Sequence, residues 1–219
     1  MLTPIVVGKL LDALPTLLWV LFATAALLLL RGPVFDKIVP RLSQVHALGV
    51  EFTLTAGHLM DKAVDTAPTA AGAETSTPAE RRGAVSRLEH ALPSLAGGRI
   101  LWVDDVPANN RYLMELFAEA GMSVDTAAST EQAVERLERG AYDIVISDIA
   151  RGDDDRAGIG MVRAFAERGI RVPVIIHAGR FDPRLGLPRG VFAATNRIDE
   201  VVQYVIDLME RARFGAPRR

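Results

Sequence analysis

The hydrophobic positions of this chain fall into two regions with different patterns. Residues 13–30 read ALPTLLWVLFATAALLLL, a run of eighteen residues without a charge. From residue 99 onward, short apolar runs alternate with stretches in which apolar residues recur every three or four positions. Short apolar runs bounded by Gly, Pro or Asp are typical of buried strands, and the longer spacing is typical of amphipathic helices. The pattern therefore predicts a hydrophobic N-terminal segment and an α/β domain.

The α/β pattern covers residues 99–213 and leaves residues 214–219 as a tail. The expected strands are Ile100–Val103, Ser123–Thr126, Ile144–Ser147, Val174–His177 and Val191–Ala194. The expected helices are Ala108–Ala120, Thr130–Arg139, Ile159–Arg168 and Asp199–Arg213. Ser129 stands at the N-cap position of the second helix. Strands joined by helical crossovers predict a doubly wound, five-stranded parallel sheet.

Acidic residues follow two of the predicted strands. Asp104 and Asp105 come directly after the first strand, and Asp148 follows the third. The carboxyl ends of parallel strands lie along one edge of a sheet, where open α/β folds place their ligand sites. Carboxylates gathered there repel one another, and hard oxygen ligands suit Mg²⁺. We expect a magnesium site whose remaining coordination positions can hold a phosphoryl group.

The uncharged N-terminal run would form about 27 Å of helix, which is enough for a thin membrane span. A cleaved signal peptide is the alternative, but Lys9 is the only basic residue before the run, and no small-x-small cleavage site follows it. Arg31, Lys37 and Arg41 come after the run. The positive-inside rule then places the N-terminus outside and the rest of the chain in the cytoplasm. We expect residues 1–33 to be a single-pass anchor.

Two segments lie between this anchor and the α/β domain. Residues 34–64 form a juxtamembrane piece, in which Val50–Thr55 alternates apolar and polar residues and predicts a strand. Residues 65–98 read as a flexible linker, because Ala, Thr, Pro, Gly and Ser dominate its first part. A short helix over Ala79–Leu92, stopped by Pro93, is expected within it.

Composition excludes several classes of function. The 219 residues carry a net charge of −2, so bulk electrostatics does not favour a nucleic-acid partner. The chain has no cysteine, which excludes disulfides and thiolate metal sites. The four histidines form no HExxH motif, and zinc hydrolysis therefore has little support.

With these strands and acids, Arg99–Arg213 resembles a two-component response-regulator receiver domain. Asp104 and Asp105 match the acidic pair that ends the first strand of that family, and Asp148 matches its phosphorylated aspartate. Gly158 is similar to the glycine that begins its third helix. The resemblance implies a flavodoxin-like sheet of order 2-1-3-4-5, and a signalling module that is not an enzyme.

The resemblance also implies a mechanism and partners. A carboxylate oxygen of Asp148 would attack the phosphorus of a phosphohistidine or a small phosphodonor. Mg²⁺ would be held by Asp105 directly, by Asp104 largely through water, by Asp148 and by the carbonyl of Ala150. A sensor histidine kinase or another protein would be the partner, at the cytoplasmic (inner) membrane of a bacterium. The sequence leaves open whether the chain self-associates.

The chain departs from the family at the positions whose side chains bind the phosphoryl group. Ala178 stands where the family carries Thr or Ser, and Thr195 is the nearest match to its lysine, so these two positions and His177 are the candidate binding positions. Arg197 is a possible substitute cation, although its planar fork differs in shape from an ammonium group. His177 is either a neutral strand-end histidine or a group that faces Asp148. Between the fourth and fifth strands the chain is too short for a full fourth helix.

These features support a degenerate, membrane-tethered receiver that accepts a phosphoryl group on Asp148 in phosphorelay signalling. The alternative is a pseudo-receiver, which would be a protein-interaction module at the membrane that is never phosphorylated. A Mg²⁺-dependent hydrolase is a third possibility, but Ala150 stands where such an enzyme would need a second catalytic aspartate.

Overall fold

The computed structural model describes residues 39–66, 76–152, 154, 156–177, 187 and 189–214, together with residues 19, 22 and 24. The chain divides into the units Met1–Val50 and Glu51–Arg219, and the side chains discussed below belong to the second unit. Over the described ranges, no helix is both long enough and apolar enough to cross a membrane. The anchor predicted over residues 13–30 lies outside these ranges except for its residues 19, 22 and 24.

The centre of the second unit is a parallel sheet of five strands in the order β2-β1-β3-β4-β5. The strands are β1 (Arg99–Val103), β2 (Ser123–Ala127), β3 (Ile144–Ser147), β4 (Val174–His177) and β5 (Val191–Thr195). This result confirms the predicted α/β fold and its strand order. The strand bounds differ from the predicted ones by one residue at most. Strands β1, β3 and β4 are short apolar runs with a clear polar end, whereas β2 also carries Asp125 and Thr126.

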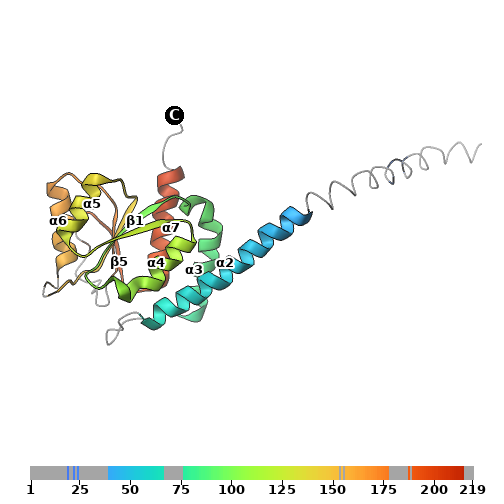
Figure 1. The fold of residues 1–219 in the computed structure, drawn as a ribbon, viewed down its shortest axis with the longest axis horizontal. Helices are drawn as coiled ribbons and strands as arrows, with labels where there is room; N and C mark the ends of the chain where they lie inside the picture. Colours follow the sequence, from blue (N-terminus) through green and yellow to red (C-terminus); the bar gives the residue numbers. More distant parts are fainter. Residues whose placement is uncertain are drawn as a thin grey trace, which may run out of the picture. The chain divides into compact units, whose positions relative to one another are not determined.

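The sheet has helices on both faces (Figure 1). Alternate strand residues point to opposite faces, so Ile100 and Trp102 of β1 join one core, while Leu101 and Val103 join the other. Helices α4 (Arg111–Glu119) and α7 (Ile198–Phe214) cover the first face. Helices α5 (Thr130–Arg139) and α6 (Ala157–Glu167) cover the second. This is the doubly wound arrangement that the sequence predicted.

Local signals account for several element ends. The helix predicted from Ala108 begins as the short 3₁₀ helix η2 (Pro107–Asn110) and continues as α4. The Ser129 hydroxyl caps α5 by accepting a hydrogen bond from the Gln132 N–H at 3.3 Å. The segment in which a shortened fourth helix was predicted, between β4 and β5, lies mostly outside the described residues.

The strand predicted over Val50–Thr55 is wrong, because these residues lie in helix α2 (Val39–Thr66). Phe52 packs against the core, whereas Leu54, two residues later, is 71% exposed. Residues two apart share a face of a strand but lie on nearly opposite faces of a helix. Beyond Phe52, the buried residues recur at helical spacing; they are Ala56, Leu59, Met60 and Ala63. This longer periodicity outweighs a six-residue alternation.

The helix expected over Ala79–Leu92 is longer and more deeply packed than predicted. Helix α3 spans Pro78–Leu95, so it continues past Pro93, whose ring nitrogen cannot donate the one helical hydrogen bond of that position. Thr77 and Glu80 form a capping box at its start. The buried side chains of α3 share one core with those of α7; on α3 they are Ala84, Val85, Leu88, Ala91 and Leu95. Residues 78–95 are therefore a core element and not part of a linker.

Candidate functional site

The structure brings the three predicted carboxylates to the carboxyl ends of β1 and β3. These strands are neighbours in the sheet, with Val103 aligned to Ser147, and the Asp148 N–H donates to the Val103 carbonyl at 3.1 Å. Asp104 and Asp105 follow β1 directly, so that all three acids stand at one edge. We call Asp104, Asp105 and Asp148 the acid edge.

The two acids after β1 are held in different ways. The Asp104 side chain is only 3% exposed and accepts two hydrogen bonds of 2.8 Å, from the Val106 N–H and from the Asn110 side-chain amide. Asp105 is exposed and accepts a hydrogen bond of 2.8 Å from the Gly152 N–H, in the loop after β3. Both carboxylates are thus oriented by donors from loops that follow the strands.

Asp148 is the least compensated carboxylate of the acid edge. Burial raises its pKa, and the negative charges of Asp104 and then Asp105 raise it further. The backbone N–H groups of Ile149 and Ala150 act in the opposite direction but do not cancel the rise. A half-buried carboxylate beside two like charges has excess negative charge that a nearby cation would relieve.

Gly158 allows α6 to begin against the residue that carries this carboxylate. Its N–H donates to the Ile149 carbonyl at 2.9 Å. A Cβ atom at this position would lie 2.7 Å from the Asp148 carbonyl oxygen and 3.1 Å from the Ile149 Cα. Both contacts involve backbone atoms, so the close approach requires a residue without a side chain.

The chemistry of the donors fits Mg²⁺, because carboxylate and carbonyl oxygens are the ligands that it prefers. Among the described residues, however, no group of three or more His, Cys, Asp or Glu side chains is gathered in a way that could hold a metal ion. Oxygens of Asp104 and Asp105 accept hydrogen bonds from Val106, Asn110 and Gly152. The magnesium site with Asp104, Asp105, Asp148 and the Ala150 carbonyl stays a prediction.

His177 and Thr195 lie at the ends of β4 and β5. The His177 ring is buried, and its Nδ1 lies 3.3 Å from the Thr195 carbonyl oxygen. Burial lowers the pKa of His177, and the carboxylate that acts against this shift is Asp104. The ring also packs edge-on against Trp102, with centroids 6.4 Å apart. These contacts favour the neutral strand-end histidine over a group that faces Asp148.

The Thr195 hydroxyl is engaged at the start of α7. It accepts a hydrogen bond of 3.0 Å from the Arg197 N–H and donates to the Glu200 carboxylate. A hydroxyl used in this way organises the helix N-terminus. Ala178, the other position at which the family carries a phosphoryl-binding group, lies outside the described residues.

The Arg197 guanidinium points to α3 and α7. It lies 2.7 Å from a Glu80 oxygen, 2.9 Å from an Asp199 oxygen and 3.5 Å from a Glu200 oxygen. The hydrogen bond from Arg197 holds the pKa of Glu80 at about 2. The cation considered as a substitute for the missing lysine therefore serves a carboxylate cluster that ties α3 to α7.

Arg151 is the residue of this region that the sequence did not single out. It lies three residues after Asp148, in a loop whose acidic composition predicts solvated side chains, yet it is only 9% exposed. Burial lowers the pKa of its guanidinium, and Asp148, Asp105 and Asp104 raise it, in that order. A basic residue three positions after a strand-end acid is the sequence signal for it.

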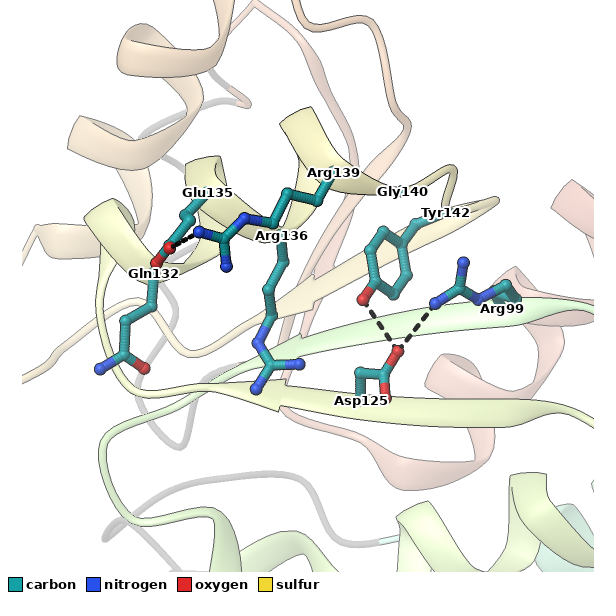
Figure 2. A pocket seen from close by; sticks show the side chains of 8 residues that line it. All are labelled: Arg99, Asp125, Gln132, Glu135, Arg136, Arg139, Gly140 and Tyr142. Carbon is teal, nitrogen blue, oxygen red and sulfur yellow. Dashed lines mark hydrogen bonds and ion pairs between the residues drawn. The ribbon is translucent and has the colours of Figure 1, made fainter.

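A separate pocket of about 660 Å³ lies between α5 and the strands β1 and β2 (Figure 2). The Tyr142 hydroxyl and the Arg99 guanidinium converge on Asp125, at 2.8 and 3.0 Å. Arg139 pairs with Glu135 at 2.6 Å. No carboxylate of the acid edge lines this pocket, and its charged groups largely satisfy one another.

Comparison with known proteins agrees with this arrangement. Residues 100–185 match the family model of the response regulator receiver domain. This part of the chain is therefore similar to the receiver domains of two-component signalling, a family of non-enzymatic signalling modules. No curated protein matches the chain.

Three solved structures illustrate the similarity. The response regulator TrrA of Thermotoga maritima, solved in complex with Mg²⁺-BeF, is 27% identical over 51% of this chain and 98% of its own, with a TM-score of 0.45. A Francisella response regulator receiver domain is 22% identical over 53% and 99%, with a TM-score of 0.47. A Clostridium difficile two-component response regulator is 19% identical over 52% and 98%, with a TM-score of 0.46.

Proposed function

We propose that this chain is a membrane-tethered receiver that accepts a phosphoryl group on Asp148 in a Mg²⁺-dependent phosphorelay. The observation that carries the proposal is the environment of Asp148. Its carboxylate ends β3 at the acid edge, is half-buried, and has a pKa raised by burial and by Asp104. A carboxylate that is partly desolvated and close to other acids is suited to bind a cation together with a phosphoryl group.

The reaction is a transfer of one phosphoryl group. An Asp148 oxygen forms a bond to phosphorus while the bond from phosphorus to the donor breaks, and the electron pair leaves with the imidazole of a phosphohistidine or with acetate. The backbone N–H groups of Ile149 and Ala150 keep part of the Asp148 charge stabilised before the attack. When bound, Mg²⁺ would offset charge on the phosphoryl oxygens; its ligands would be Asp104, Asp105, Asp148 and the Ala150 carbonyl.

The experiment is incubation of the chain with acetyl phosphate and Mg²⁺, followed by intact mass measurement. The wild type should gain the mass of one phosphoryl group, and Asp148→Asn should gain none. Asp143→Asn is a matched control, because Asp143 precedes the same strand at its other end and accepts a hydrogen bond of 2.8 Å from the Arg99 N–H. An unmodified wild type would refute the phosphoacceptor assignment.

A pseudo-receiver is the second candidate, and one specific observation favours it. The Thr195 hydroxyl and the Arg197 guanidinium are both engaged with carboxylates at the start of α7. Neither is then available to bind a phosphoryl group at the acid edge. A wild type that binds partners but gains no mass with acetyl phosphate would establish this candidate.

The membrane tether is proposed from the uncharged run over residues 13–30. The run would hold the chain in the cytoplasmic membrane of a bacterium through apolar burial, with the receiver in the cytoplasm beside a sensor histidine kinase or another protein partner. Membranes washed with carbonate or high salt should retain the full chain, and deletion of residues 1–33 should release it. Recovery of the intact chain in the wash would overturn the tether.

A further inference from the structure

Arg151 occupies an unusual environment for an arginine in a polar loop. Its side chain is buried where the loop after β3 meets α5 and α6. One terminal nitrogen lies 3.8 Å from the Met161 sulfur on α6, and the other lies 3.4 Å from the Thr130 hydroxyl oxygen on α5. Both are weak partners for a cation. Within the described ranges, no carboxylate lies at ion-pair distance from this guanidinium.

The carboxylates that act most strongly on Arg151 are those of the acid edge, ahead of Asp154 in the same loop. Asp148, Asp105 and Asp104 each favour its charged form. The loop backbone fixes this proximity, since the N–H of the next residue, Gly152, donates to Asp105 at 2.8 Å. Burial and the charge of Asp104 still raise the pKa of Asp148, so this carboxylate stays undercompensated.

The charges at the acid edge indicate a role for the Arg151 guanidinium. Three carboxylates carry three negative charges, and one bound Mg²⁺ neutralises two of them. An incoming phosphoryl group brings further negative charge, which needs a second cation close by. Arg151 is a cation that is coupled to Asp148, whereas Arg197 is engaged with Glu80 and Asp199.

The geometry points to Arg151 as the resident cation of the acid edge, which competes with Mg²⁺ for the carboxylates and binds the phosphoryl oxygens when Asp148 is phosphorylated. This inference rests on the proposed function. A guanidinium suits the role because its planar fork can donate two parallel hydrogen bonds to phosphoryl oxygens. Its weak bonds to Thr130 and Met161 leave donors that can turn to such a ligand.

The test compares Arg151→Met, Arg151→Lys and Arg156→Met in the full chain. Met replaces the buried arginine with an apolar side chain of similar reach, and Lys keeps the charge but loses the fork. Arg156 is exposed in the same loop, so its replacement removes an equal charge from a side chain that is not buried beside α5 and α6. Calorimetry with Mg²⁺ alone and the rate of labelling by acetyl phosphate with saturating Mg²⁺ are the two readouts.

We expect the two readouts of Arg151→Met to move in opposite directions. Loss of a unit charge beside a divalent cation should tighten Mg²⁺ binding by about tenfold or more, and should slow labelling by a similar factor. Arg151→Lys should give intermediate values, and Arg156→Met should match the wild type. A residue that only fills space would lower both readouts through misfolding or change neither.

Each other result has a definite meaning. Unchanged Mg²⁺ affinity in Arg151→Met would overturn the assignment of Arg151 to the acid edge. Tighter Mg²⁺ binding with unchanged labelling would overturn its role toward the phosphoryl group. A wild type that is not labelled at all would refute the proposed function and the phosphoryl role together, while the Mg²⁺ measurement would still decide whether the guanidinium neutralises the carboxylates.

Discussion

Gly158 gives the sharpest quantitative prediction, because a second glycine in the same helix serves as its control. In Gly158→Ala, the new Cβ atom would lie 2.7 Å from the Asp148 carbonyl oxygen, 3.1 Å from the Ile149 Cα and 3.3 Å from the Ile176 Cδ1. Two of these three neighbours are backbone atoms, so the start of α6 must shift away from the end of β3. Overpacking of this kind costs about 1–3 kcal/mol.

Gly160→Ala places the same methyl group two residues later in α6, where nothing lies within 4 Å. Alanine is the better helix former at this exposed position, so we expect a gain of about 0.5–1 kcal/mol. The two variants should therefore differ by about 1.5–4 kcal/mol and lie on opposite sides of the wild type.

Urea unfolding of the full chain in a mild detergent, followed by circular dichroism, measures both changes. In a thermal scan, the two variants should differ in Tm by roughly 3–16 °C. Gly158→Ala should also label more slowly with acetyl phosphate, since the displaced backbone carries Asp148. Equal stabilities for the two variants would refute the close approach of α6 to β3.

Two further predictions concern the core and the pH dependence of stability. Leu88 of α3 is 0% exposed, so Leu88→Ala should lower the free energy of unfolding in urea by about 2–5 kcal/mol. Leu54→Ala, at an exposed site of α2, should change it by less than about 0.5 kcal/mol. Similar changes in the two variants would show that α3 is not part of the core. Burial lowers the pKa of His177, so the unfolded chain binds more protons than the folded one near pH 6. The associated stability should be complete above about pH 6.5 and should be lost as the pH falls through that value toward the lowered pKa, and His177→Gln should flatten this part of the profile. A wild-type profile already flat over that range would contradict a buried neutral histidine.

The sequence alone determined the sheet and the position of its acids. Strands β1, β3 and β4 are short apolar runs with polar residues at their ends, and the carboxyl ends of neighbouring parallel strands must lie at one edge. Asp104, Asp105 and Asp148 could therefore be placed together before any coordinates. Strand patterns of this kind depend on only a few neighbouring residues, and the structure contains the strands and the acids where these patterns predict them.

Only the tertiary structure decided which segments outside the sheet join the core. The short alternation over Val50–Thr55 fits a strand, but packing of Phe52 and the residues after it selects the helix. Helix α3 was expected only as a short helix within a linker, and its burial depends on α7, more than a hundred residues later. Whether such a segment is a helix, a strand or a linker depends on the apolar area that it buries against distant residues, and a local sequence pattern does not contain that information.

Tertiary structure also assigned the two arginines in a way that the sequence could not. Arg197 follows β5 closely, where a cation could reach the acid edge, but it pairs with Glu80 and Asp199. Arg151 belongs to an acidic loop that predicts solvent exposure, but α5 and α6 enclose it. A long charged side chain can reach several partners from one backbone position. Its partner depends on which carboxylates the fold places within a few ångströms, because electrostatic attraction and desolvation both depend on distance and burial.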